Sequence, residues 1–218
     1  MKAVLFDFDG VIANTLQYHV EGWNRAYRKF GYDVTVNEED ISRQEGKGAD
    51  QIVAGIAAMY ELKLTKSQLE EITAEKRNVY KQITHASVYP ETQAFLNELK
   101  QRSVRIALVT GSVIPSLLQV VDQEFLDQFE VIITQYDVVN TKPDPEPFLK
   151  AAERLKLQPE QCVVIENAPM GIKAAKAAGM YCVALRTTIH DDTWLMEADL
   201  IVDHADKIDL DLLLTIGN

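Results

Sequence analysis

Residues 4–11 read Val4-Leu5-Phe6-Asp7-Phe8-Asp9-Gly10-Val11, and this stretch decides how the rest of the chain is interpreted. An apolar run of strand length ends in two aspartates one residue apart, and the glycine that follows lets the chain turn. Such a strand carries its carboxylates to the edge of a sheet, where open α/β folds bind their ligands. The pair could be oxygen ligands of a metal ion, or a nucleophile beside an acid/base. A plain polar turn would have the same sequence.

Three later motifs also follow stretches that we predict to be strands. They read Val109-Thr110-Gly111-Ser112, Thr141-Lys142-Pro143-Asp144-Pro145 and Val164-Ile165-Glu166-Asn167-Ala168-Pro169-Met170-Gly171. Together with residues 6–15 they resemble, in order, motifs I to IV of the haloacid dehalogenase (HAD) superfamily, in the β-phosphoglucomutase-like group with a helical cap. Four short motifs in order are far more specific than any one of them.

The composition is that of a folded protein without affinity for polyanions. With 218 residues, 47% of them hydrophobic, the chain can bury a full core. The net charge of −11 opposes binding to nucleic acid or acidic membranes, so we expect neither as a partner. No apolar run approaches about 18 residues and the chain starts directly on a strand, so we expect no membrane span, no signal peptide and a cytoplasmic location. Cys162 and Cys182 are expected to be buried free thiols.

Helical and strand patterns divide the chain into two parts. Between residues 15 and 87 apolar side chains recur at helical spacing, and from residue 88 short strands alternate with helices. Helices are expected in the first part at residues 15–30, 49–60 and 67–84, the last opened by the capping box Ser67-x-x-Glu70. The alternation predicts an α/β fold: a doubly wound, Rossmann-like parallel sheet in residues 1–14 and 88–218, with an α-helical cap domain inserted at 15–87.

The resemblance implies catalytic roles for four residues of the sheet edge. Asp7 would attack phosphorus and form an aspartyl-phosphate, and Asp9 would protonate the leaving oxygen and later deprotonate water. Lys142 would supply the fixed cation that phosphoryl transfer needs. Thr110, with Gly111 and Ser112, would hold phosphoryl oxygens through its hydroxyl and nearby amides, although Ser112 could equally serve as a simple helix cap.

A magnesium site is expected beside these residues. Glu166 and Asn167, with Asp7 and the backbone carbonyl of Asp9, offer the oxygen ligands that Mg²⁺ prefers. The HAD pattern most often has Asp where this chain has Asn167, so one negative charge is lost. Glu45, in a polar stretch before a predicted cap helix, could compensate, or it could be an ordinary solvated acid.

Further cap residues are candidates for contact with the substrate. Thr15 and His19 recur on one helix face where the chain enters the cap, and the resemblance implies that the histidine positions the acid/base. A purely structural histidine fits the sequence equally well. Lys76 resembles a cap lysine that reaches the substrate, and a solvated helix face explains it almost as well. Lys47 lies in Gly46-Lys47-Gly48-Ala49, where β-phosphoglucomutases have an arginine, and could substitute for it.

Three functions are compatible with the sequence. The first is a Mg²⁺-dependent phosphohydrolase of small phosphorylated metabolites, and Glu45 with Asn167 resembles a branch that cleaves inorganic pyrophosphate. The second is a sugar phosphomutase like β-phosphoglucomutase, which the missing cap arginine disfavours. The third is a non-catalytic binding protein on a HAD scaffold, which would have lost Asp7, Asp9 or Lys142. We expect a small phosphorylated substrate and a monomer or weak homodimer.

Overall fold

Six parallel strands form a single sheet in the order β3-β2-β1-β4-β5-β6 in the computed structural model, which describes residues 1–216. The strands are β1 Ala3–Phe6, β2 Arg105–Val109, β3 Val131–Ile133, β4 Cys162–Glu166, β5 Tyr181–Leu185 and β6 Leu200–Val202. The order reverses beside β1, so the sheet is doubly wound. The expected α/β fold class is confirmed.

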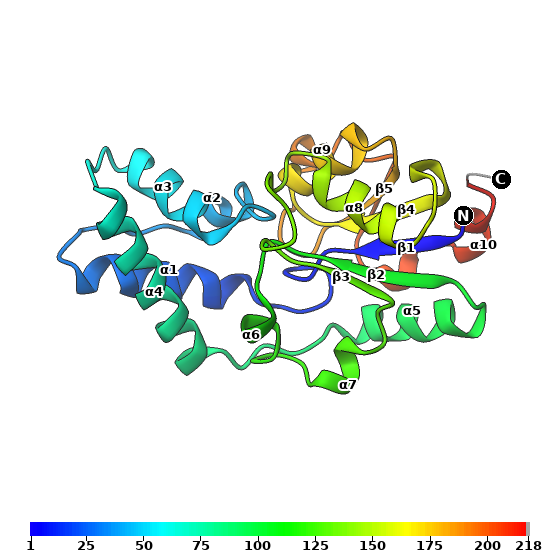
Figure 1. Cartoon of the computed structure of the whole chain (residues 1–218), viewed down its shortest axis with the longest axis horizontal. Coiled ribbons are helices and arrows are strands. Elements are labelled where there is room, and N and C mark those ends of the chain that lie inside the picture. The colour runs from blue at the N-terminus through cyan, green and yellow to red at the C-terminus, as the bar shows by residue number, and fades with distance from the viewer. Residues whose placement is uncertain (217–218) are drawn as a thin grey trace.

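Strand β1 is central because its side chains are apolar on both faces. Val4 and Phe6 belong to one hydrophobic cluster, whereas Ala3 and Leu5 belong to another on the opposite face. This alternation has the period of two that a pleated strand imposes. Helices α5 and α10 lie on one side of the sheet, and α8 and α9 lie on the other (Figure 1).

The helices that follow the strands of the sheet are mostly short. Their bounds are α5 Pro90–Gln101, α6 Ile114–Leu117, α7 Gln123–Leu126, α8 Glu146–Arg154, α9 Pro169–Ala177 and α10 Leu210–Leu214, with single 3₁₀ turns η1 Pro159–Gln161, η2 Asp192–Trp194 and η3 Ala205–Lys207. Cys162 and Cys182 are buried and free, as expected. Within residues 1–216, no helix is both long and apolar enough to span a membrane.

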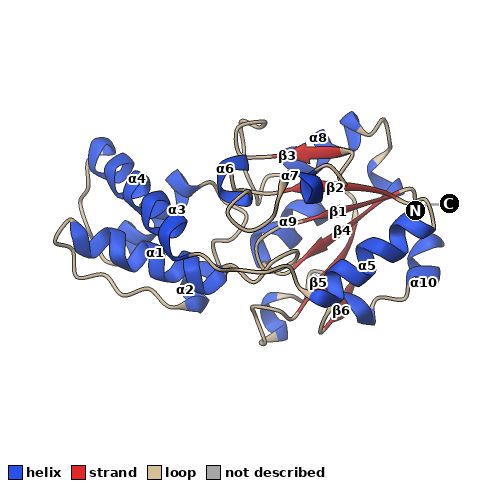
Figure 2. Cartoon of the chain, turned by 90° about the horizontal axis from the view of Figure 1, so that it is seen from below, coloured by secondary structure: helices blue, strands red, loops and turns tan. Residues whose placement is uncertain are grey.

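Four helices gather at the end of the molecule away from the termini (Figures 1 and 2). They are α1 Leu16–Lys29, α2 Glu38–Ser42, α3 Ala49–Met59 and α4 Lys66–Ile83. They enclose a hydrophobic cluster of their own, in which Trp23, Tyr27 and Ile56 are buried. This separate core supports our proposed division of the chain, with the cap at 15–87 and the catalytic core in residues 1–14 and 88–218.

The two chain crossings between cap and sheet run side by side. The amide of Asn14 donates to the carbonyl oxygen of Ser87 over 3.2 Å, and Ala13 forms an antiparallel bridge with Val88. The amide of Tyr89 donates to the carbonyl oxygen of Ile12. The cap therefore leaves and rejoins the sheet at one place.

Two features of the cap differ from the sequence prediction. The capping box of α4 consists of Thr65 and Gln68, not Ser67 and Glu70, because Thr65 has the extended backbone of an N-cap and accepts from the Gln68 amide. The short helix α2 was not predicted. Its sequence is polar, and a capping box of Asn37 and Asp40 defines its start.

Candidate active site

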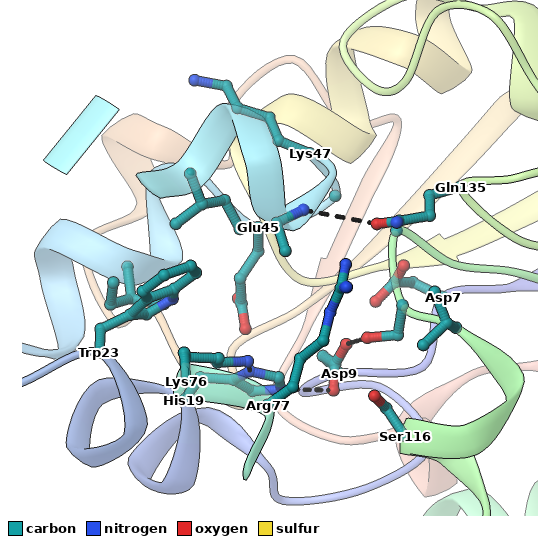
Figure 3. Close-up of a pocket in the computed structure, with 17 residues that line it drawn as sticks. Asp7, Asp9, His19, Trp23, Glu45, Lys47, Lys76, Arg77, Ser116 and Gln135 are labelled. Carbon is teal, nitrogen blue, oxygen red and sulfur yellow. Dashed lines mark hydrogen bonds and ion pairs between the residues drawn. The ribbon is translucent and has the colours of Figure 1, made fainter. Parts of the chain in front are cut away.

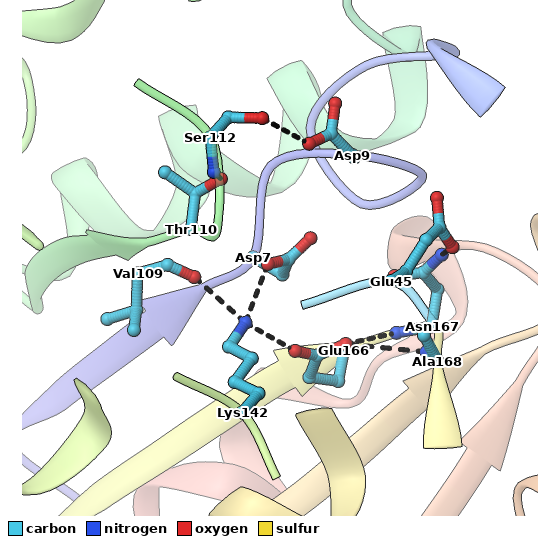
Figure 4. A network of polar contacts seen from close by, with 10 residues as sticks. All are labelled: Asp7, Asp9, Glu45, Val109, Thr110, Ser112, Lys142, Glu166, Asn167 and Ala168. Atoms are coloured by element: carbon cyan, nitrogen blue, oxygen red, sulfur yellow. Dashed lines mark hydrogen bonds and ion pairs between the residues drawn. The ribbon is translucent and has the colours of Figure 1, made fainter. Parts of the chain in front are cut away.

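The register of the three central strands places their polar ends together. Phe6 pairs with Leu108 on one side and Ile165 on the other, so Asp7, Thr110 and Glu166 follow at the same edge. Figure 4 shows Asp7, Glu166 and the carbonyl oxygen of Val109 converging on Lys142, which comes from the loop before α8. This edge is where an open parallel sheet binds ligands.

Lys142 is held as a fixed cation. Its Nζ donates to Asp7 Oδ1 and Glu166 Oε1, each over 2.6 Å, and to the carbonyl oxygen of Val109 over 2.9 Å. The side chain is 1% exposed. Burial alone would lower the pKa of Lys142, but the carboxylates of Asp7 and Glu166 raise it above its ordinary value. All three ammonium hydrogens are thus used, and the charge is permanent in the working range.

Asp7 is buried among other carboxylates and faces the cavity. Burial raises the pKa of Asp7 to about 8; Lys142 opposes this, and Glu166 and Asp9 add to it. A carboxylate with so high a pKa attacks phosphorus only when a cation nearby favours its ionised form.

Asp9 is held by three side chains. Its Oδ1 accepts from Thr15 Oγ1 over 2.7 Å and from His19 Nε2 over 3.0 Å, and its Oδ2 accepts from Ser112 Oγ over 2.9 Å. Burial raises the pKa of Asp9, but His19, Thr15 and Ser112 together hold it below its ordinary range. Asp9 is therefore ionised at rest.

Lys76 sets the hydrogen position on His19. The Lys76 ammonium lies 2.7 Å from His19 Nδ1, and an ammonium can only donate. Nδ1 is therefore the acceptor, and Nε2 carries the hydrogen that it donates to Asp9. Burial, with a further contribution from Lys76, lowers the pKa of His19, whereas Asp9 opposes this change. Lys76, predicted as a substrate contact, thus also orients the histidine.

Glu45 and Asn167 meet between cap and core. The Asn167 amide nitrogen donates to Glu45 Oε2 over 3.1 Å and to Thr188 Oγ1 over 2.8 Å. Asn167 Oδ1 and Glu45 Oε1 are both buried without a hydrogen-bond partner. Burial, followed by repulsion from Asp9, Asp7 and Glu166, raises the pKa of Glu45 well above its ordinary value.

These two unpartnered oxygens fit a hard cation. A buried acceptor without a donor is costly, and a cation with oxygen ligands removes that cost. Within residues 1–216, no cluster of three or more His, Cys, Asp or Glu side chains forms a preformed metal cage. Mg²⁺ does not need one, since it keeps several waters and takes few protein oxygens. The oxygens of Asp7, Glu45 and Asn167, with the Asp9 carbonyl, would hold it.

Glu166 has a second role in the structure. Its Oε1 accepts from Lys142, and its Oε2 accepts from the amides of Asn167 and Ala168. Both oxygens therefore anchor the lysine and the turn after β4. Its assignment as a metal ligand stays a prediction.

The cap loop before α3 closes over the sheet edge. A Cβ atom on Gly111 would lie 2.6 Å from the carbonyl oxygen of Lys47, so only glycine lets the cap backbone approach this closely. The Lys47 ammonium points away from Asp7 and Asp9 in Figure 3, and its role as a substrate contact stays a prediction. Thr110 Oγ1 accepts from the Ser112 amide over 2.9 Å, which uses one amide that was expected to bind phosphate.

A small cavity lies between cap and core. Its volume is ≈ 60 Å³, and Asp7, Asp9, His19, Glu45 and Lys76 line it. Sequence reasoning missed Gln135 and Arg77, which also line it. Gln135 follows β3 at the same sheet edge, so strand order could have indicated it, and its Oε1 accepts from the Ala49 amide across the cap boundary.

Comparison with known proteins gives a consistent result. The model of the haloacid dehalogenase-like hydrolases matches residues 1–179. The chain is 32% identical to a β-phosphoglucomutase of Bacillus subtilis, over 98% of this chain and 94% of that protein. It is also 32% identical to a validoxylamine A 7′-phosphate phosphatase of Streptomyces hygroscopicus, over 95% of each. A β-phosphoglucomutase structure from Clostridium difficile superposes with a TM-score of 0.83 at 26% identity, covering 99% of this chain and 96% of that one.

Proposed function

The chain belongs to the haloacid dehalogenase-like hydrolases, and from this premise we propose that it is a Mg²⁺-dependent phosphohydrolase acting through an aspartyl-phosphate on Asp7. The observation that carries the proposal is that Asp7 and Asp9 line one cavity, with Lys142 bonded to Asp7 and with Glu45, which has an unpartnered buried oxygen, lining the same cavity. A bound Mg²⁺ would offset charge on the phosphoryl group and favour ionised Asp7.

Two displacements account for hydrolysis. An oxygen of Asp7 attacks phosphorus, and the bond from phosphorus to the leaving oxygen breaks with its electron pair on that oxygen. Water then attacks the same phosphorus while Asp9 takes its proton, and the bond to Asp7 breaks to release phosphate and free carboxylate. Lys142 stays beside Asp7 throughout and stabilises the charge that builds up in both transition states.

Asp9 favours a substrate with a weakly basic leaving group. Because its hydrogen bonds keep it ionised at rest, Asp9 is better prepared as a base for the second step than as an acid for the first. A departing phosphate needs far less help from an acid than a departing alkoxide does. Inorganic pyrophosphate is therefore our proposed substrate.

The size of the cavity supports the same choice. Its ≈ 60 Å³ is far below the roughly 300–1,000 Å³ typical of pockets for larger ligands. Glu45 lines this cavity, and we infer that its side chain would restrict the room for a sugar. The similarity to the β-phosphoglucomutase of Bacillus subtilis keeps a phosphomutase as the second candidate. The retained contact between Asp7 and Lys142 argues against a non-catalytic protein.

Phosphate release from a substrate panel tests the proposal. Pyrophosphate, glycerol phosphate and β-glucose 1-phosphate are each assayed with Mg²⁺ and with EDTA. We expect the fastest release from pyrophosphate, loss of release in EDTA, and a decrease of about a thousandfold in Asp7→Asn. Conversion of β-glucose 1-phosphate to its 6-phosphate would instead establish the phosphomutase. No reaction with any of the three would overturn both.

A further inference from the structure

The basic side chains of the site differ in whether they are already engaged. Lys142 is bound to Asp7 and Glu166, and Lys76 is bound to His19. Lys47 points away from the two aspartates (Figure 3). Arg77 lines the cavity, and within residues 1–216 its guanidinium has neither a hydrogen-bond acceptor nor a carboxylate partner.

Arg77 points into the site despite its exposed position on α4. Figure 3 shows its guanidinium extending from the cap into the space between Glu45 and Asp7. The positive charge of Arg77 also affects Lys76. Burial is the main cause of the lowered pKa of Lys76; Asp9 opposes this shift, and Arg77 lowers the pKa further. An unpaired guanidinium facing a cluster of acids, in a chain of net charge −11, indicates an anion that is bound there during function.

We propose that Arg77 binds the leaving group of the substrate and that this leaving group is itself an anion. The inference rests on the proposed function. The phosphoryl group under attack lies on the core side, against Asp7 and Lys142, so the departing part faces the cap, where Arg77 is located. The planar fork of arginine matches two phosphate oxygens at once. A neutral alcohol has no anionic oxygens for the guanidinium to bind.

Arg77 should bind the leaving group more tightly in the transition state than in the bound substrate. As the bond from phosphorus to the leaving oxygen breaks, negative charge grows on the leaving group and its attraction to the guanidinium increases. The substrate class is therefore a phosphoanhydride, or another phosphoryl compound whose departing part has its own negative charge. This arginine comes from helix α4 and not from the loop Gly46-Lys47-Gly48-Ala49.

The test compares two substrates in three variants. Pyrophosphate has an anionic leaving group, whereas glycerol phosphate releases a neutral alcohol. Arg77→Ala should lower kcat/KM for pyrophosphate by about 30-fold and for glycerol phosphate by less than about threefold. The kcat/KM of Arg77→Lys for pyrophosphate should fall between those of wild type and Arg77→Ala. Lys81→Ala removes a charge from an exposed site on the same helix, outside the cavity, and should change neither value.

Equal losses on both substrates, or no loss on either, would overturn the role of Arg77 while leaving the hydrolase intact. Failure of wild type to cleave either substrate would instead count against the proposed function. In that case, calorimetry with pyrophosphate and Mg²⁺ compares Asp7→Asn with Asp7→Asn/Arg77→Ala, in which turnover is blocked. Weaker binding by about 30-fold in the double variant supports the inference, and equal affinity overturns it.

Discussion

The side-chain amide of Asn167 donates to the carboxylate of Glu45 across 3.1 Å and joins two residues 122 positions apart. Glu45 comes from the cap and Asn167 from the end of β4. The bond leaves one buried oxygen on each residue without a partner, and we assign both oxygens to the proposed metal site. The proposed site would therefore take ligands from the cap as well as from the core, so it depends on how the cap is placed over the sheet.

Replacing the Glu45 carboxylate should weaken the metal site more than the fold. Glu45→Gln keeps the shape but removes an anionic oxygen, so we expect half-activation at about tenfold higher Mg²⁺. The melting temperature in EDTA should not fall, because a buried amide needs no ionisation. Glu38→Gln makes the same change at an exposed site of the cap. An unchanged Mg²⁺ titration in Glu45→Gln would exclude Glu45 as a ligand.

Adding a carboxylate at residue 167 should lower the stability of the protein in the absence of Mg²⁺. Asn167→Asp replaces the donor to Glu45 with a second carboxylate, and the two acids then repel each other. We expect the melting temperature in EDTA to fall by about 5 °C and saturating Mg²⁺ to restore most of the loss. Asn97→Asp, on the exposed surface of α5, is the matched control. A loss that Mg²⁺ does not restore would argue against a cation between these residues.

Alanine substitutions at two glycines distinguish the effect of blocking the approach of the cap loop from the effect of backbone strain. Gly46 and Gly31 have φ angles of +89° and +82°, so alanine strains both by about 1 kcal/mol. A Cβ on Gly46 would lie 2.7 Å from Cδ of Lys142, whereas one on Gly31 has no neighbour within 4 Å. Gly46→Ala should therefore lose about 100-fold in kcat/KM, and Gly31→Ala should keep its activity. Similar activities of the two variants, both folded by circular dichroism, would show that the loop need not approach Lys142.

Lys76 should make stability depend on pH in the alkaline range. Burial lowers the pKa of Lys76 from 10.5 to about 8. Between these values the unfolded chain binds more protons than the folded one, so the folded state gains stability as the pH rises. Relative to Lys76→Met, wild type should gain about 2 kcal/mol in the free energy of unfolding between pH 7 and pH 10. Urea denaturation at both pH values measures this, with Lys81→Met as the exposed control. Parallel changes in wild type and Lys76→Met would contradict the burial of a charged lysine.

The sheet and its catalytic edge were predictable because local and long-range signals agree. The apolar run before Asp7 requires a buried strand, and parallel strands bring their carboxyl ends to one edge. The short strands expected from residue 88 onward are present as β2 to β6. Once the motifs fall at the ends of β1, β2 and β4, the placement of Asp7, Thr110 and Glu166 at one edge follows from topology.

The cap was harder to predict, because several local patterns there are nearly equivalent. Thr65-Lys66-Ser67-Gln68 and Ser67-Gln68-Leu69-Glu70 both fit a capping box, and only the backbone shows that Thr65 is the N-cap. Arg77 was missed for a similar reason. Neighbours on a helix point about 100° apart, and the sequence does not tell which direction faces the sheet. That direction depends on how the cap docks.

The paired crossings at Asn14 and Ser87 have an evolutionary consequence. Because the inserted segment departs and returns at neighbouring points, it can be lengthened, shortened or exchanged as a cassette without displacing a single strand of the sheet. New cap sequences can then evolve over an unchanged catalytic core. Substrate specificity and the chemistry of cleavage can then evolve independently within one chain.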